Sequence, residues 1–316
     1  MGRYFIRRVI QIIPLLFGIT ILVFLLVNAV PGNPVADLAF NPGVRPEDIA
    51  AIKHALGLDQ PLYKRYFTWI GNVVQGNLGL DMITYRPVTQ EVLERLPNTL
   101  KLTLAAFCMA LFFSIPVGVY SAVKRNTMFD NVATVLAVAG VAIPLFWFGL
   151  LMILFFSVNL RWFPSGGTAT IGGGGFLDQV HHLILPAVTL AIVELAGWTR
   201  YIRGQMLEVI RQDYIRTAQA KGLRERAVIF RHALRNALLP LVTLMGLAIP
   251  NFFSGALITE TIFSWPGIGR LTYDAAIARN YTVIMGAVLI SAFLVILCNL
   301  LADMAYAWLD PRIKLG

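Results

Sequence analysis

The sequence predicts an all-α membrane protein, a polytopic bundle of six transmembrane helices with a short helix at its cytoplasmic face. The first observation is composition: 57% of the 316 residues are hydrophobic, only 14% are charged and the mean hydropathy is +0.70. Soluble domains carry about 25% charged residues, so this chain is too apolar for water. The second observation is that apolar stretches of membrane-crossing length recur along the chain. The third is that Lys and Arg gather in alternate connecting segments.

The expected spans are residues 9–30, 98–122, 132–159, 183–203, 237–258 and 283–309. The first contains no charged side chain and reaches about 33 Å as a helix, enough for the hydrocarbon core. A removed signal peptide is the alternative for this span. Its apolar stretch exceeds the usual core of about 7–15 residues, so we expect it to be retained.

Charge outside the spans predicts the orientation. The cations concentrate at the amino end, near 123–131, in 200–235 and in the tail, which include Arg3, Arg7, Arg8, Lys124, Arg125, Arg203, Arg211, Arg216, Lys221, Arg224, Arg226, Arg231, Arg235, Arg312 and Lys314. Short loops rich in Lys and Arg lie in the cytoplasm, so we expect both termini there. Because the charge follows this topology, it does not indicate nucleic-acid binding.

The extramembrane segments carry further expectations. Segment 31–97 is the main outer part, and helices are expected at 46–56 and 62–74. The second helix has an apolar set at helical spacing, namely Tyr63, Tyr66, Phe67, Ile70 and Val74. The glycine run in 160–182 is expected to be a flexible loop and not a phosphate cradle, since no helix with Lys and Ser/Thr follows it.

The sequence offers no catalytic or metal site. It has no nucleotide-binding G-x-x-x-x-G-K-[ST] pattern and no nucleophilic triad, so the chain is not expected to be an enzyme. Cys108 and Cys298 fall inside spans and are expected to be buried hydrophobes. The adjacent His181 and His182 are more often solvated than metal-bound at such a position.

Residues 213–222 predict a short helix inside the longest basic stretch. Asp213 is a suitable N-cap, Gly222 suits the left-handed C′ position, and Tyr214, Ile215 and Ala218 share a face. Such a helix is marginal alone in water and needs a partner surface. A basic helix lying on anionic lipid is the alternative, and it is strongest for 224–236. Beyond it, Ala227, Phe230, Ala233, Leu234 and Ala237 form an apolar stripe.

Polar groups inside spans mark a candidate pathway, because they are costly in lipid. Glu194 is the strongest, followed by Asn299 and Asp303. Glu194 is a candidate contact for a substrate amine, but a pair with Arg200 or with a residue of another subunit explains it equally well.

Several stretches carry a family resemblance. D-Y-I-R-T-A-Q-A-K-G-L followed by R-H-A-L-R-N-A-L-L-P resembles the coupling (EAA) loop of ABC importer permeases. The stretches V-P-G-N-P, R-L-P-N-T-L-K-L-T, E-T-I-F-S-W-P-G-I-G-R-L and L-D-P-R-I extend the likeness over nearly the whole chain. Together they are similar to the B-type inner-membrane permease subunit of dipeptide and oligopeptide ABC importers. One departure is that His232, Ala233, Leu234 and Arg235 stand where the general pattern has I-x-L-P.

The resemblance implies a type I ABC importer permease that forms half of a pore for short peptides. Nickel, glutathione and oligosaccharide are alternative cargoes, and an ion-coupled secondary transporter or a membrane scaffold are more distant readings. The implied partners are a second homologous permease, ATP-binding subunits that hold ATP and Mg, an extracytoplasmic substrate-binding protein and membrane lipid. No cofactor is implied on this chain. The implied location is the cytoplasmic (inner) membrane of a bacterium or archaeon.

The resemblance also assigns residues. Coupling to the ATPase falls on Asp213, Tyr214, Ile215, Thr217, Ala218, Ala220, Lys221, Gly222 and Leu223. Residues 259–278 are expected to form an aromatic loop that reaches the binding protein through Phe263, Trp265, Pro266, Gly267 and Gly269; an interfacial anchor is the simpler reading of Trp265 alone. We expect residues 1–97 to form an N-terminal helix with its outer segment, and 98–316 the permease core.

Overall fold

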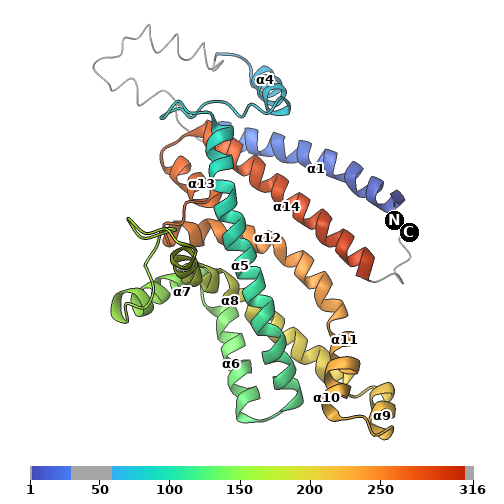
Figure 1. Ribbon diagram of the computed structural model, residues 1–316. Helices are drawn as coiled ribbons and strands as arrows, with labels where there is room; N and C mark the ends of the chain where they lie inside the picture. The colour runs from blue at the N-terminus through green and yellow to red at the C-terminus, as the bar shows by residue number, and fades with distance from the viewer. Residues whose placement is uncertain (1, 30–58, 310–316) are drawn as a thin grey trace. The chain divides into compact units, whose positions relative to one another are not determined.

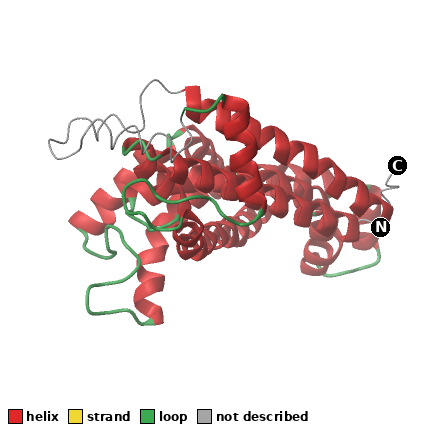
Figure 2. Ribbon diagram, turned by 90° about the horizontal axis from the view of Figure 1, so that it is seen from above, coloured by secondary structure: helices red, strands yellow, loops and turns green. Residues whose placement is uncertain are grey.

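The computed structural model describes residues 2–29 and 59–309, and every regular element in this part of the chain is helical (Figures 1 and 2). The expected helix at 46–56 lies outside the described residues. In lipid a helix satisfies all of its own backbone hydrogen bonds, which explains the dominance of this element. The prediction of an all-α polytopic bundle is confirmed.

Within residues 2–29 and 59–309, five helices are long and apolar enough to cross a membrane. They lie within α1 (Gly2–Ala29), α5 (Val88–Val123), α8 (Phe176–Val209), α12 (Leu239–Ile262) and α14 (Tyr281–Leu309). Most of them extend beyond the expected spans, because the helix continues past the apolar window into polar residues such as Glu91 and Glu208.

The expected span 132–159 is not one straight helix. It consists of α6 (Met128–Ala142) and α7 (Leu145–Met152), the latter continued by the π-helical turn η1 (Ile153–Asn159), and the two parts are bent by 111°. Pro144 causes the break, because its ring pushes Ile143 out of the helical region and into an extended conformation. A sixth crossing therefore exists only if this bent pair counts as one span.

The described chain divides into two compact units. One contains residues 98–266 and 297–309, and in it α8 packs against α6, α7, α11 (Leu234–Ala237) and α12. Its core includes Leu102, Leu190, Trp198, Ile202, Met206, Ile215, Leu241 and Phe252. The small residue Gly118 lets α5 approach α8 closely, because a Cβ there would lie 2.9 Å from the Ile202 Cβ.

The other unit contains residues 2–29, 59–97 and 267–296, including α4 (Leu62–Val74) and α13 (Ile268–Ile277). The bounds of the α4 helix were predicted correctly, but only part of its predicted apolar set is buried. Tyr66 is buried against Phe24 of α1 and shares a hydrogen bond of 2.8 Å with Thr20, whereas Tyr63 and Phe67 are exposed. The contacts of Tyr66 with Thr20 and Phe24 of α1 therefore set the orientation of α4.

Asp81 organises the turn between α4 and α5. Its Oδ1 accepts hydrogen bonds from the backbone N–H groups of Ile83 (2.6 Å) and Thr84 (2.9 Å) and from Asn280 Nδ2 (2.7 Å). Burial opposes ionisation of this carboxyl, but these donors outweigh it and hold the pKa of Asp81 below its ordinary value. Asp81 thereby ties the turn to the residues just before α14.

Replacing Asp81 with Ala should lower the free energy of unfolding by about 1–3 kcal/mol, because three donors lose their acceptor. A depressed folded-state pKa stabilises the protein above the ordinary pKa, and this stabilisation is lost as pH falls through the folded-state value. The difference in Tm between wild type and Asp81→Ala should therefore narrow below about pH 4.

Thermal unfolding of the purified chain in detergent at several pH values measures this difference. Asp274→Ala is the control, because Asp274 is exposed and lies 3.7 Å from Arg270. A difference that stays constant down to about pH 3 would contradict the role assigned to the Asp81 carboxylate.

Candidate functional site

The short helix expected at 213–222 is α9 (Asp213–Ala220). Asp213 was predicted to be its N-cap, but the N-cap is Gln212. No side-chain hydrogen bond caps this end of the helix. Asp213 instead occupies the first turn, where its carboxylate lies 3.6 Å from the Arg216 guanidinium. A carboxylate in the first turn still complements the helix dipole. Asp213 therefore marks the start of the helix, as predicted, but one residue after the N-cap position.

The end of α9 is as predicted. Gly222 has φ +74°, its N–H donates to the Gln219 carbonyl at 2.9 Å, and the Leu223 N–H donates to the Ala218 carbonyl at 3.4 Å. These two bonds form a Schellman motif, which needs a left-handed residue at this position. The motif turns the chain sharply away from α9.

The two faces of α9 have different environments. Ile215 and Ala218 are only 1% and 6% exposed and belong to the bundle core. Tyr214 is exposed at the edge, and its hydroxyl accepts a hydrogen bond of 3.0 Å from Asn236 of α11. The remaining candidate coupling residues are exposed, namely Asp213, Thr217, Ala220, Lys221, Gly222 and Leu223. Ile215 and Ala218 thus anchor the helix on its own chain, and the opposite face is open.

The segment that receives α9 follows α10 (Glu225–Ala227) and is π-helical, η2 (Val228–Ala233). Figure 1 shows α9 beside α10 and α11, and α9 contacts η2. Val228, Ala233 and Ala237 are the buried residues here, while Phe230 is exposed. The predicted stripe assumed a regular helix, and the wider π turn moves Phe230 off the buried face.

A buried ion pair fixes the neighbouring helices. Asp130 of α6 is 2% exposed, and its carboxylate accepts hydrogen bonds from Arg203 of α8 through Nε (2.5 Å) and Nη2 (2.8 Å). Ser121 of α5 donates to the same carboxylate at 2.6 Å, and the Asn126 backbone N–H donates at 2.9 Å. One carboxylate therefore joins three helices, and its partner Arg203 lies ten residues before the first residue of α9. Arg203 was predicted only to be a cytoplasmic charge. The feature of the sequence that could have revealed the pair is Asp130, the lone acid in the first turn of an apolar helix.

Two of the three aromatic residues of the 259–278 segment are buried, and the third, Tyr273, is exposed. Phe263 and Trp265 are 0% and 3% exposed, and Trp265 Nε1 donates to the Asn98 carbonyl at 3.0 Å. Much of the segment predicted to be a loop is helical, because α12 continues to Ile262 and α13 begins at Ile268. Between these helices the Phe263 carbonyl accepts a hydrogen bond from the Gly167 N–H at 2.9 Å. Contact of this segment with a binding protein stays a prediction. Gly267 caps α13, which contains Gly269.

Glu260 is a functional candidate that sequence analysis missed. It is fully buried near the end of α12, and its Oε1 accepts a hydrogen bond of 2.7 Å from Thr99 of α5. The expected span stopped at residue 258, so this acid was assigned to the loop. The Asn98 amide also donates to the Pro266 carbonyl at 3.0 Å, which closes the same junction.

The loop at 160–175 is fastened by a histidine. His182 is buried, and its Nδ1 lies 2.9 Å from the Gly166 carbonyl and its Nε2 3.3 Å from Thr170 Oγ1. The expectation of a solvated histidine pair is therefore wrong for His182. No cluster of three His, Cys, Asp or Glu side chains suited to a metal occurs among the described residues. Cys108 is exposed on the chain surface, contrary to expectation, and Cys298 is half-buried.

The candidate pathway residues Glu194 and Asn299 lie on different helices, α8 and α14. Glu194 accepts a hydrogen bond of 3.0 Å from Asn251 of α12, so its partner within this chain is Asn251 and not Arg200. Asn299 is half-buried on α14. Asp303 lies on the same helix, but its side chain is outside the described part of the structure. Substrate contact at these residues stays a prediction.

Comparison with known proteins decides the family. Residues 114–315 match the family described as binding-protein-dependent transport system inner membrane component, and residues 1–103 match the N-terminal region of such components. The chain belongs to this family. It is therefore a multi-pass permease of a multi-subunit transport system and not itself a catalytic subunit. The resemblance found in the sequence is confirmed, and membership favours it over an ion-coupled carrier or a scaffold.

Relatives of this permease match over the full chain. The oligopeptide transport system permease protein AppB of Bacillus subtilis (strain 168) is 48% identical, over 99% of this chain and 100% of its own. The dipeptide transport system permease protein DppB of Escherichia coli (strain K12) is 42% identical over 99% of both chains. The glutathione transport system permease protein GsiC of the same strain is 40% identical over 99% of both.

A solved structure supports the permease fold. A chain of the MetNI methionine ABC transporter in inward-facing conformations aligns with a TM-score of 0.55 at 19% identity, covering 69% of this chain and 96% of that chain. At this identity the likeness shows the fold alone.

The Asp130–Arg203 pair should show strong energetic coupling in a double-mutant cycle. We expect about 1–3 kcal/mol between Asp130→Asn and Arg203→Gln, because the carboxylate is buried and doubly bonded to the guanidinium. Thermal unfolding of the two single variants and the double variant measures this coupling. The exposed pair Asp213 and Arg216 is the matched control and should show no measurable coupling. Equal coupling in the two pairs would contradict the structural role of Asp130.

Proposed function

We propose that this permease is the B-type subunit of an ATP-driven importer that carries short peptides into the cytoplasm. It forms half of the pore, and a second homologous permease forms the other half. ATP-binding subunits, which hold ATP and Mg, dock on the open face of α9, and an extracytoplasmic binding protein delivers the peptide. Support for the cargo comes from the named relatives, two of which carry oligopeptides and dipeptides.

The observation that carries the coupling part of the proposal is the two-sided environment of α9. Its inner face is held by Ile215 and Ala218, while Thr217, Ala220 and Lys221 present small and cationic groups outward. A rigidly seated helix moves with the bundle when an outside protein pushes it. The positive-inside pattern supports a cytoplasmic position for this face and for both termini, and the proposed membrane is the inner membrane of a bacterium or archaeon.

Glutathione is a second candidate cargo. The glutathione permease is 40% identical over the full chain, and glutathione is itself a tripeptide, so the two cargoes share a chemical class. Nickel chelates and oligosaccharides have no such support among these relatives.

Gly222→Ala tests the coupling role. The side chain meets open space, but the left-handed φ of +74° costs about 1–2 kcal/mol for an L-residue. If the strain weakens docking of the ATP-binding subunits by this free energy, uptake of a labelled dipeptide should drop about five- to thirtyfold. The measurement uses a strain that expresses the variant as its sole copy of the permease. Gly204→Ala is the matched control, because Gly204 also faces open space but lies inside α8 with ordinary helical geometry.

Uptake should stay normal for Gly204→Ala, with both variants present in the membrane at wild-type amounts. Unlabelled di- and tripeptides should compete for uptake, whereas nickel and maltooligosaccharides should not. Normal uptake with Gly222→Ala would contradict the coupling role, and competition by a sugar or metal alone would contradict the peptide cargo.

A further inference from the structure

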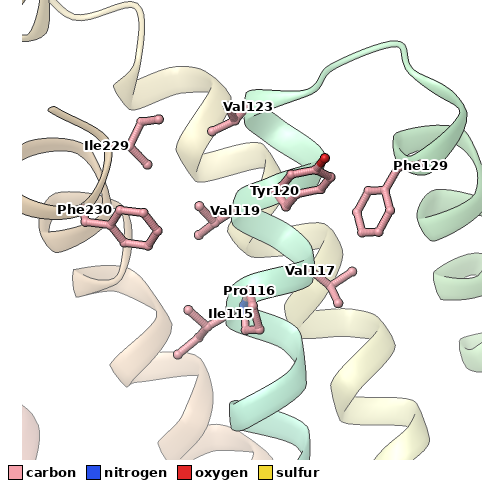
Figure 3. A pocket seen from close by; sticks show the side chains of 9 residues that line it. All are labelled: Ile115, Pro116, Val117, Val119, Tyr120, Val123, Phe129, Ile229 and Phe230. Carbon is pink, nitrogen blue, oxygen red and sulfur yellow. The ribbon is translucent and has the colours of Figure 1, made fainter. Parts of the chain in front are cut away.

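A purely apolar groove of about 530 Å³ lies at one end of the α5 helix. Figure 3 shows Ile115 and Val119 of α5 turned toward Phe230, and Tyr120 turned toward Phe129 of α6. The other lining residues are Pro116, Val117, Val123 and Ile229. The Tyr120 and Phe129 rings meet edge to face at 4.7 Å, which gives the groove a firm aromatic side.

The groove ends beneath a cationic turn. Val123 and Phe129 both line it, so the connecting turn, which begins with Lys124 and Arg125, crosses its end. On the opposite side Arg231 directly follows the lining residue Phe230, and Arg226 precedes Ile229 by one helical turn. All four of these cations are exposed, and among residues 2–29 and 59–309 none forms an ion pair.

The acidic groups in this region do not cancel this charge. Asp130 follows Phe129, but its carboxylate is buried and bonded to Arg203. Glu225 adjoins Arg226 and is the one exposed acid in 221–236. The two segments that flank the groove, 123–129 and 225–231, therefore carry an excess of exposed positive charge. The Tyr120 hydroxyl points toward the end of the groove at the 123–129 turn and offers a hydrogen-bond donor (Figure 3).

We propose that this groove binds the acyl chain of an anionic phospholipid, whose phosphate lies among Lys124, Arg125, Arg226 and Arg231. An acyl chain matches the wholly apolar lining, and the phosphate matches these cations, since basic pockets between transmembrane helices on the cytoplasmic side hold anionic headgroups. The lipid would fill the space between α5, α6 and η2, the segment that seats α9. The proposal is independent of the transported solute.

Native mass spectrometry tests the site on the full purified chain. The chain is released from micelles that contain either phosphatidylglycerol or phosphatidylcholine of the same acyl length. We expect preferential retention of phosphatidylglycerol. The double variant Lys124→Gln with Arg125→Gln should weaken that retention about tenfold, since cations near an anionic lipid each contribute to binding. Arg200→Gln with Arg211→Gln removes two exposed cations elsewhere and should retain the preference.

A groove-filling variant tests the apolar part separately. Ile229→Trp should reduce retention of both lipids, whereas Phe112→Trp, at an exposed α5 position outside the groove, should not. Equal retention of the two lipids in wild type, or full retention with Ile229→Trp, would overturn the proposal.

Photo-crosslinking decides between lipid and protein in the assembled transporter. Benzoylphenylalanine in place of Phe230 should react with phospholipid. Reaction with another protein subunit instead would assign the groove to a protein contact and would also overturn the proposal.

Discussion

The packing of α9 against its own bundle is the contact on which the proposed coupling role of this permease depends. A helix of eight residues is marginal in water, and α9 persists because Ile215 and Ala218 are buried in the same core as Ile202 and Met206 of α8. The Schellman motif at Gly222 and the Tyr214–Asn236 hydrogen bond hold its end and its edge. These three contacts turn a short surface segment into a rigid extension of the bundle with one open face.

The bundle is stiffened at both ends by polar junctions that tie α5 to the later helices. At the α9 end, the Asp130 carboxylate joins α5, α6 and α8. At the other end, Thr99 and Asn98 of α5 bond to Glu260 and Pro266 at the end of α12. In a low-dielectric interior such hydrogen bonds are strong, and a buried polar group that loses its partner costs free energy. Intermediate helix positions that break these bonds are therefore unfavourable, so the helices at each junction are held in discrete arrangements. This property suits a pore that moves between two states.

The sequence predicted the class of fold because hydropathy and charge act over whole spans. It also predicted the bounds of α4 and the C-terminal end of α9, where Gly222 has a single conformational explanation. It failed at three other places. Pro144 was counted inside a span although its own ring breaks the helix, and the π turn at η2 shifted the buried stripe. Glu260 was assigned to a loop, and the burial of Glu260 and Trp265 involves Thr99 and Asn98, which are far away in the chain and therefore invisible to a local pattern. The assignments of partners to individual site residues stay predictions.

Cysteine cross-linking between α9 and the ATP-binding subunit tests the central claim most directly. In a background with Cys108→Ala and Cys298→Ala, single cysteines replace Thr217 and Lys221 on the open face and Ala218 on the buried face. The account predicts that the first two cross-link to the ATP-binding subunit in the assembled transporter and that the third does not. Cross-linking only from position 218, or labelling of positions 217 and 221 by an impermeant reagent outside intact cells, would contradict it.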